Sequence, residues 1–142
     1  MKISKQELAI RKKFDWNTVK DRNCIKFDEK SGLKHKKAVM DYCWELLQEG
    51  EPFFTKARMK PKTTGFPHTN QLCADILIPE QGVVVEVIDS ESDKSIERKR
   101  EIWKKEGLTL QTIDVNDANN IIIGCDFALG KDISVERKIV MK

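Results

Sequence analysis

Two acidic residues interrupt apolar runs that are typical of buried β-strands. Glu86 lies within the run 83–88, VVVEVI, and Asp75 lies within the run 73–78, CADILI. Side chains alternate along a strand, so Glu86 shares a face with Val84 and Ile88. An ionised carboxylate is costly to bury without a partner, so it either takes up a proton or binds a cation. Both residues therefore call for a chemical explanation.

The spacing of the two runs favours a shared site. Only PEQG separates them, which is short enough for a hairpin turn. If the turn makes the strands neighbours, the carboxylates of Asp75 and Glu86 could converge at one end of a sheet. Mg²⁺ prefers oxygen ligands, binds through one or two carboxylates and keeps waters that can attack a phosphate. The pair therefore indicates a site for Mg²⁺ or Mn²⁺.

Hydrophobic periodicity predicts the elements that must position these carboxylates. Apolar residues recur at helical spacing over 33–48, and Gly50 follows as a stop signal. A second helix is predicted over 93–107, with Ile96, Lys99, Ile102 and Trp103 along one face. The run 108–115 returns as a strand, and a helix between two strands implies a parallel crossover.

Weaker signals predict the remaining elements. They are a capped helix beginning at Ser4, a helical turn over 15–21, strands at 23–27 and 52–59, a helix over 117–130 interrupted by Gly124, and a strand or helix over 132–140. At 142 residues the chain is long enough for one domain and short for two, so we expect a single domain over 1–142 with 1–30 as a helical extension.

Composition excludes several classes. Hydrophobic residues make up 39% and charged residues 35%, which is a globular composition. No segment approaches the roughly 20 apolar residues of a membrane-spanning helix, and MKISKQELAIRKK lacks a signal peptide's apolar core. We therefore expect an intracellular, cytoplasmic protein without a membrane partner.

The four cysteines form no CxxC pair, so they predict reduced thiols and no zinc site, with Cys43 and Cys73 in the core.

Charge is distributed unevenly along the chain. Residues 1–62 carry 16 Lys and Arg against 9 Asp and Glu, whereas residues 63–142 carry 10 against 14. A basic half beside an acidic half suits a protein that binds a polyanion with one surface and cations with another, although solvated charged faces give the same count. The basic side chains expected to bind nucleic-acid phosphates are Lys36, Lys37, Lys60, Lys62 and Lys99.

The order of these features resembles the PD-(D/E)XK nuclease superfamily. Ala74-Asp75 stands where that family has Pro-Asp, and Glu86-Val87-Ile88 stands where it has (D/E)-x-K. The resemblance covers about residues 33–115 as an arrangement of elements. It implies an α/β protein of restriction-endonuclease-like fold, with a central mixed β-sheet of four to five strands flanked by helices. It also implies metal-dependent hydrolysis of DNA phosphodiester bonds.

The same resemblance implies roles for individual residues. Asp75 and Glu86 would be catalytic residues and ligands of Mg²⁺ or Mn²⁺, with the Val87 carbonyl as a third ligand. Nucleases similar to the RecB nuclease domain carry a further histidine or glutamate on the first helix. His35 stands at the matching place, on the helical face formed by positions 35, 39, 42 and 46.

One residue departs from the family pattern. Ile88 stands where the family has a lysine that positions the attacking water and stabilises developing charge. Lys94 or Lys99 on the following helix, or Lys36 or Lys37 beside His35, could replace it, and Lys94 is the one we assign to the catalytic set. The alternative is a catalytically degenerate module that binds nucleic acid or a protein partner, as a monomer or a homodimer, without cleavage.

Each candidate also has a structural interpretation. Asp75 could cap a strand end, Glu86 could be a paired core charge, and His35 could be an ordinary polar residue of a helix. The three tryptophans are not clustered in sequence, which favours core packing over base stacking; they are Trp16, Trp44 and Trp103.

Overall fold

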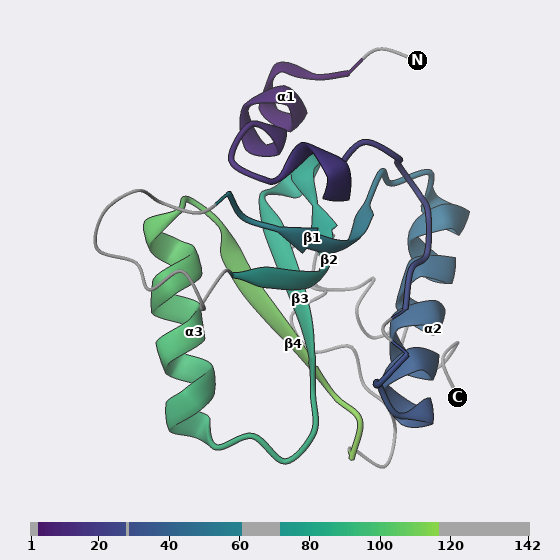
Figure 1. Ribbon diagram of the computed structural model, residues 1–142, viewed down its shortest axis with the longest axis vertical. Helices are drawn as coiled ribbons and strands as arrows, with labels where there is room; N and C mark the ends of the chain where they lie inside the picture. The colour runs from purple at the N-terminus through teal and green to yellow at the C-terminus, as the bar shows by residue number, and fades with distance from the viewer. Residues whose placement is uncertain (1–2, 28, 61–71, 117–142) are drawn as a thin grey trace.

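The fold is built on a mixed sheet of four strands. The computed structural model describes residues 3–27, 29–60 and 72–116. The strands are β1 (Phe54–Arg58), β2 (Cys73–Ile78), β3 (Val83–Ile88) and β4 (Thr109–Asp114), and they lie side by side in chain order (Figure 1). The pairs β1–β2 and β2–β3 are antiparallel, and β3–β4 is parallel. The predicted hairpin of β2 and β3 and the predicted parallel crossover are confirmed.

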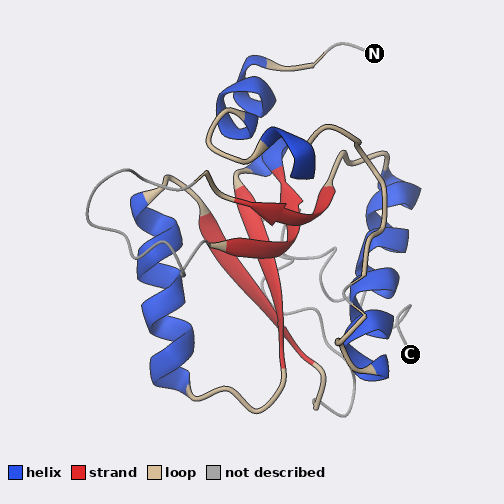
Figure 2. Ribbon diagram, viewed as in Figure 1, coloured by secondary structure: helices blue, strands red, loops and turns tan. Residues whose placement is uncertain are grey.

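Helices cover both faces of this sheet. They are α1 (Lys5–Arg11), α2 (Leu33–Glu49) and α3 (Asp93–Lys105), with short 3₁₀ turns η1 (Trp16–Thr18) and η2 (Pro79–Gln81). Figure 2 shows α2 and α3 on opposite sides of the strands. The predicted α/β class, with a mixed sheet flanked by helices, is therefore confirmed.

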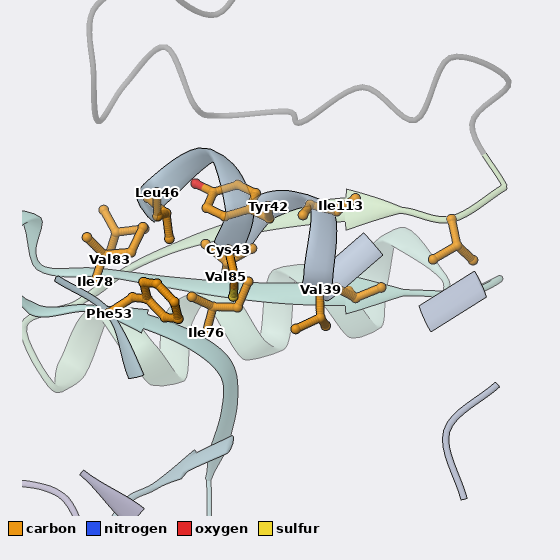
Figure 3. Close-up of a cluster of buried hydrophobic side chains, with 12 residues drawn as sticks. Val39, Tyr42, Cys43, Leu46, Phe53, Ile76, Ile78, Val83, Val85 and Ile113 are labelled. Atoms are coloured by element: carbon orange, nitrogen blue, oxygen red, sulfur yellow. The ribbon is translucent and has the colours of Figure 1, made fainter. Parts of the chain in front are cut away.

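The α2 face of the sheet holds one of two apolar clusters. Val39, Tyr42, Cys43 and Leu46 recur at helical spacing on α2 and are at most 3% exposed. They pack on strand residues such as Val85 (Figure 3). The helix ends at Gly50, whose φ of 71° is the left-handed conformation that glycine adopts without a steric penalty.

The α3 face holds a second apolar cluster. Trp103 of α3 is fully buried and lies against Phe14, with ring centroids 6.3 Å apart. Ser92 caps the helix by accepting the Ser95 N–H, and Gly107 follows it at a φ of 80°. Val84 of β3 points into this cluster. Because side chains alternate, Glu86 lies on the same face.

The N-terminal segment takes part in the core. Ser4 caps α1 as predicted, and Ile10, Phe14 and Val19 belong to the cluster on the α3 face. Glu7 is fully buried, and both Arg11 and Arg22 bind its carboxylate. Residues 3–27 therefore help to build the core.

The predicted strand at 23–27 is wrong. These residues lie beside β1 but pair with it mostly through side chains. The Asn23 N–H donates to the Phe53 carbonyl, while the Thr55 hydroxyl donates to the Cys24 carbonyl and accepts the Lys26 N–H. The Thr55 hydroxyl thus makes hydrogen bonds that main-chain groups of β1 would make to a paired strand, so residues 23–27 do not form a strand.

The tryptophan prediction is correct for one residue. Trp103 is buried, but Trp16 and Trp44 are each 59% exposed.

The predicted elements at 117–130 and 132–140, and Lys62, lie outside the described residues. Among the helices that the structure describes, none is long and apolar enough to cross a membrane.

Candidate active site

Asp75 lies where β2 and β3 separate. The last hydrogen-bonded pair of the β2–β3 ladder is Ile76–Val85. If the ladder continued by one residue, Asp75 would lie opposite Glu86. Instead, the Asp75 side chain reaches across, and Oδ2 accepts the Val87 N–H at 2.8 Å. A carboxylate that bonds a main-chain N–H of the next strand lies close to the plane of the sheet. Asp75 and Glu86 therefore come from neighbouring strands at this end of the sheet.

His35 approaches Asp75 from α2. Its Nε2 lies 3.4 Å from Asp75 Oδ2, close enough for an ion pair if the imidazole is protonated. The other ring nitrogen, Nδ1, is buried and bonds no partner among the described residues. Asp75 is 17% exposed, so solvent reaches the pair. The predicted neighbourhood of His35 and Asp75 is thus observed.

Glu86 faces α3. Trp103 Nε1 donates to Glu86 Oε2 at 3.3 Å, and Lys99 Nζ lies 3.8 Å from Oε1. Burial raises the pKa of Glu86, although the charge of Lys99 and the Trp103 hydrogen bond oppose that rise. The negative charge of Asp75 raises the pKa further, so the two carboxylates are within electrostatic range of each other.

Lys99 forms ion pairs with Glu86 and Glu91. Its Nζ lies 3.0 Å from Glu91 and 3.8 Å from Glu86. Desolvation lowers the pKa of Lys99, but the Glu91 hydrogen bond and the charges of Glu86, Glu91 and Asp75 outweigh it, and the pKa is raised. Lys99 therefore stays an ammonium group, which can donate hydrogen bonds and hold positive charge but cannot accept a proton from water.

Lys94, which the sequence places in the catalytic set, lies elsewhere. It is exposed in the first turn of α3 and forms no hydrogen bond or ion pair with Asp75 or Glu86. Lys99 is brought to Glu86 because it lies one turn from Ile96 and Trp103, on the stripe that faces the sheet. A lysine within an apolar stripe is the sequence signal that distinguishes the two.

The other basic candidates are spread around the site. Lys36 is half-buried beside His35, Lys37 forms an ion pair with Asp41 at 2.7 Å, and Lys60 is exposed beyond the end of β1. None of these three forms an ion pair with the two carboxylates among the described residues. Their predicted contact with nucleic acid stays a prediction.

Lys56 is a neighbour that the sequence does not indicate. It lies in β1 between the pairs Thr55–Ile76 and Ala57–Ala74, hence opposite Asp75. Its φ of 54° is left-handed, which is costly for a residue with a Cβ. Backbone strain of this kind is frequent near functional sites.

Cys43 is buried in the core as predicted, whereas Cys73 is only half-buried, and neither thiol is suited to nucleophilic chemistry. Burial raises the pKa of Cys73, although nearby Lys56 and Arg58 oppose that rise. Burial raises the pKa of Cys43 to about 12. Both groups therefore stay protonated near neutral pH, and the thiolate is the reactive form.

The donor set suits a hard divalent cation. Asp75 and Glu86 supply two carboxylates at a partly solvated edge. The Ile88 carbonyl accepts a hydrogen bond from the Val115 N–H, on the β4 side of β3. Main-chain groups of successive residues point to opposite sides of a strand, so the N–H and carbonyl of Val87 point toward β2 and Asp75. No three His, Cys or acidic side chains form a metal-ligand group within the described residues. A cation here would combine two carboxylates and the Val87 carbonyl with water, as Mg²⁺ commonly does.

No protein-family model matches this chain, and no curated protein or solved structure does either. The mixed sheet between helices is seen directly in the structure. Its relationship to the restriction-endonuclease-like fold stays a prediction.

Proposed function

We propose that this protein is a metal-dependent nuclease that hydrolyses DNA phosphodiester bonds, with a divergent PD-(D/E)XK-type site on a restriction-endonuclease-like fold. The main support is that Asp75 and Glu86 lie on neighbouring strands where β2 and β3 separate, within electrostatic range of each other, with Lys99 beside Glu86. Two acids at a solvated strand end, next to a permanent positive charge, can serve both a cation and a phosphate.

The proposed ligands are the Asp75 and Glu86 carboxylates and the Val87 carbonyl. Bound Mg²⁺ or Mn²⁺ would supply Lewis-acid chemistry toward a phosphate oxygen and a water. His35 positions Asp75 through their 3.4 Å contact. Without a cation, the Lys99 ammonium partly balances Glu86, and Asp75 accepts the Val87 N–H beside His35, which explains how both acids are tolerated at a half-buried position.

Lys99 takes the role that Ile88 cannot perform. Ile88 is 6% exposed and has no hydrogen-bonding group, whereas the Lys99 ammonium reaches the same end of the sheet from α3. Because Lys99 stays charged, it donates to the attacking water or to a phosphate oxygen and offsets negative charge as it develops. Lys36 and Lys60 are the basic residues proposed to contact the DNA backbone.

Cleavage of supercoiled plasmid DNA in Mg²⁺ or Mn²⁺ tests this proposal. We expect Asp75→Asn and Glu86→Gln each to reduce the rate about 100-fold or more, and Lys99→Met to reduce it by a similar factor. Asp93→Asn and Lys94→Met are the matched controls, because both residues are exposed in the first turn of α3. Unchanged cleavage by Asp75→Asn and Glu86→Gln would show that the site is assigned incorrectly.

The second candidate is a nucleic-acid-binding module without catalysis. It is favoured by the apolar residue at position 88 and by the lack of a three-ligand metal group among the described residues. It predicts DNA binding that weakens steeply with salt, needs no divalent cation and is unchanged in Asp75→Asn. Binding without cleavage in either metal would favour this candidate over the nuclease.

A further inference from the structure

Helix α2 carries a second apolar stripe, on its outer side. Leu33, Met40, Trp44 and Leu47 are 83%, 49%, 59% and 38% exposed, respectively. With Lys37, whose side chain is 64% exposed, they follow one another at separations of four, three, four and three residues. This alternation is the heptad spacing of a helix–helix seam.

The fold itself does not require this stripe. The residues of α2 that pack on the sheet are Val39, Tyr42, Cys43 and Leu46, on the other side of the helix. A helix that covers one face of a sheet needs one apolar side and normally exposes a polar one. An outer side with Met40 and Trp44 at its centre therefore indicates a contact with something else.

The charges on α2 are also arranged unusually. Lys34, Lys36 and Lys37 lie in its N-terminal half, and Asp41, Glu45 and Glu49 lie in its C-terminal half. The first turn has no acidic residue and the last turn no basic one. This order is the reverse of what the helix dipole favours, so helix stability does not explain it.

We propose that α2 pairs antiparallel with α2 of a second copy of this chain, across a two-fold axis. In this arrangement the lysine-rich end of one helix lies beside the acidic end of the other, and the two helix dipoles oppose each other favourably. Both the apolar spacing and the charge order are then used by the same contact. A two-fold pair is self-complementary, so no other partner is needed.

The heptad spacing also sets a register. Seam residues of antiparallel helices alternate, which places Met40 of one copy opposite Trp44 of the other, and Lys37 opposite Leu47. The aliphatic part of Lys37 can cover Leu47 while its ammonium group stays in water beside Asp41. This proposal uses the outer side of α2 and does not depend on the proposed nuclease site.

Sedimentation of the full chain over a range of concentrations tests the pairing. We expect the mass to rise from 16.4 kDa toward twice that value as concentration increases. Trp44→Gln should weaken the association about tenfold or more, because a central aromatic residue is lost. Trp16→Gln is the matched control, since Trp16 is equally exposed but lies outside the stripe, and it should leave the association unchanged.

Cross-linking tests the orientation. In a chain with Cys24→Ser, Cys73→Ser and Cys125→Ser, a short thiol-reactive cross-linker should join a Lys37→Cys chain to a Leu47→Cys chain more efficiently than it joins two Lys37→Cys chains. Preferential links between two Lys37→Cys chains would indicate parallel helices and would overturn the proposal.

Three further results would overturn it. The first is a mass that stays at 16.4 kDa at every concentration. The second is a dimer that Trp44→Gln does not weaken. The third is a monomer in which Trp44 fluorescence is protected from acrylamide, a result that would show that another part of the same chain covers the stripe.

Discussion

Glu86 is an acid whose environment opposes its charge. Burial raises its pKa despite the ammonium of Lys99 at 3.8 Å and the Trp103 N–H at 3.3 Å. A core evolved only for stability would hold an uncharged residue at this position. Retaining a glutamate beside a second carboxylate is the pattern expected when stability is given up for a binding or catalytic site.

The raised pKa of Glu86 predicts how stability depends on pH. The folded protein binds the proton of Glu86 more tightly than the unfolded chain does. The stability contributed by this group is therefore complete below the ordinary glutamate pKa of about 4.3 and is lost as pH rises through the raised folded pKa. Glu86→Gln should thus unfold at higher urea than the wild type at neutral pH, when both are measured in EDTA.

This difference in urea midpoint should disappear below about pH 4, where Glu86 is protonated in both states. A Glu86→Gln variant that is less stable than the wild type at neutral pH would contradict the account. It would mean that the contacts with Lys99 and Trp103 outweigh desolvation.

At the scale of the elements, β1 contains a strained position opposite the site. Lys56 has a φ of 54°, a conformation that costs a residue with a Cβ about 1 kcal/mol and costs glycine almost nothing. Lys56→Gly and Lys56→Ala lose the same side-chain contacts beyond Cβ. We therefore expect the glycine variant to be the more stable of the two by about 1 kcal/mol in urea unfolding.

Arg58 provides the control, because it lies in the same strand without a positive φ. There the order should reverse, with Arg58→Ala more stable than Arg58→Gly. If alanine is also the better residue at position 56, the backbone of Lys56 is not left-handed in solution.

Helix α1 is attached through a buried charge. Glu7 is fully buried and binds Arg11 Nη1 at 3.2 Å and Arg22 Nε at 3.0 Å. Removing one partner of such a cluster leaves the others without a counter-charge. Glu7→Gln should therefore lower the free energy of unfolding by about 3 kcal/mol.

The matched control for this prediction is Glu97→Gln. Glu97 forms an ion pair with Arg100 on the exposed side of α3, and its loss should cost less than about 1 kcal/mol. Equal losses in the two variants would show that Glu7 does not hold the N-terminal segment in place.

Periodic signals predicted the elements better than local ones. The helices α2 and α3 follow from apolar stripes, and β2 and β3 follow from apolar runs, because burial on one or two faces requires those patterns. The strand expected at 23–27 fails because the side chain of Thr55 provides hydrogen bonds that a strand would have made. That competition is visible only once both segments are placed side by side.

The sequence singles out the two acids of the proposed site but not its lysine. Asp75 and Glu86 are conspicuous because a charge inside an apolar strand needs a partner. The choice of Lys99 over Lys94 depends on which side of α3 faces the sheet. The register of Trp103 against Glu86 fixes that side, and sequence alone does not supply this register.

At the scale of the whole molecule, the sheet and its two covering helices place residues that are distant in sequence at the same end of strands β2 and β3. His35 comes from α2, Asp75 and Glu86 from neighbouring strands, and Lys99 from α3. The site lies at the carboxyl end of the parallel pair β3 and β4, which is where open α/β sheets commonly bind ligands. A divalent cation that binds only the folded protein would also stabilise it.

The central claim is that Asp75 and Glu86 together hold a divalent cation. Calorimetric titration of the full chain with Mn²⁺ tests it directly, without requiring that the DNA substrate be known. We predict saturable binding of one ion per chain, lost in Asp75→Asn and in Glu86→Gln and retained in Asp93→Asn, whose carboxylate is exposed on α3. The absence of saturable binding, or binding that survives both site substitutions, would contradict the account.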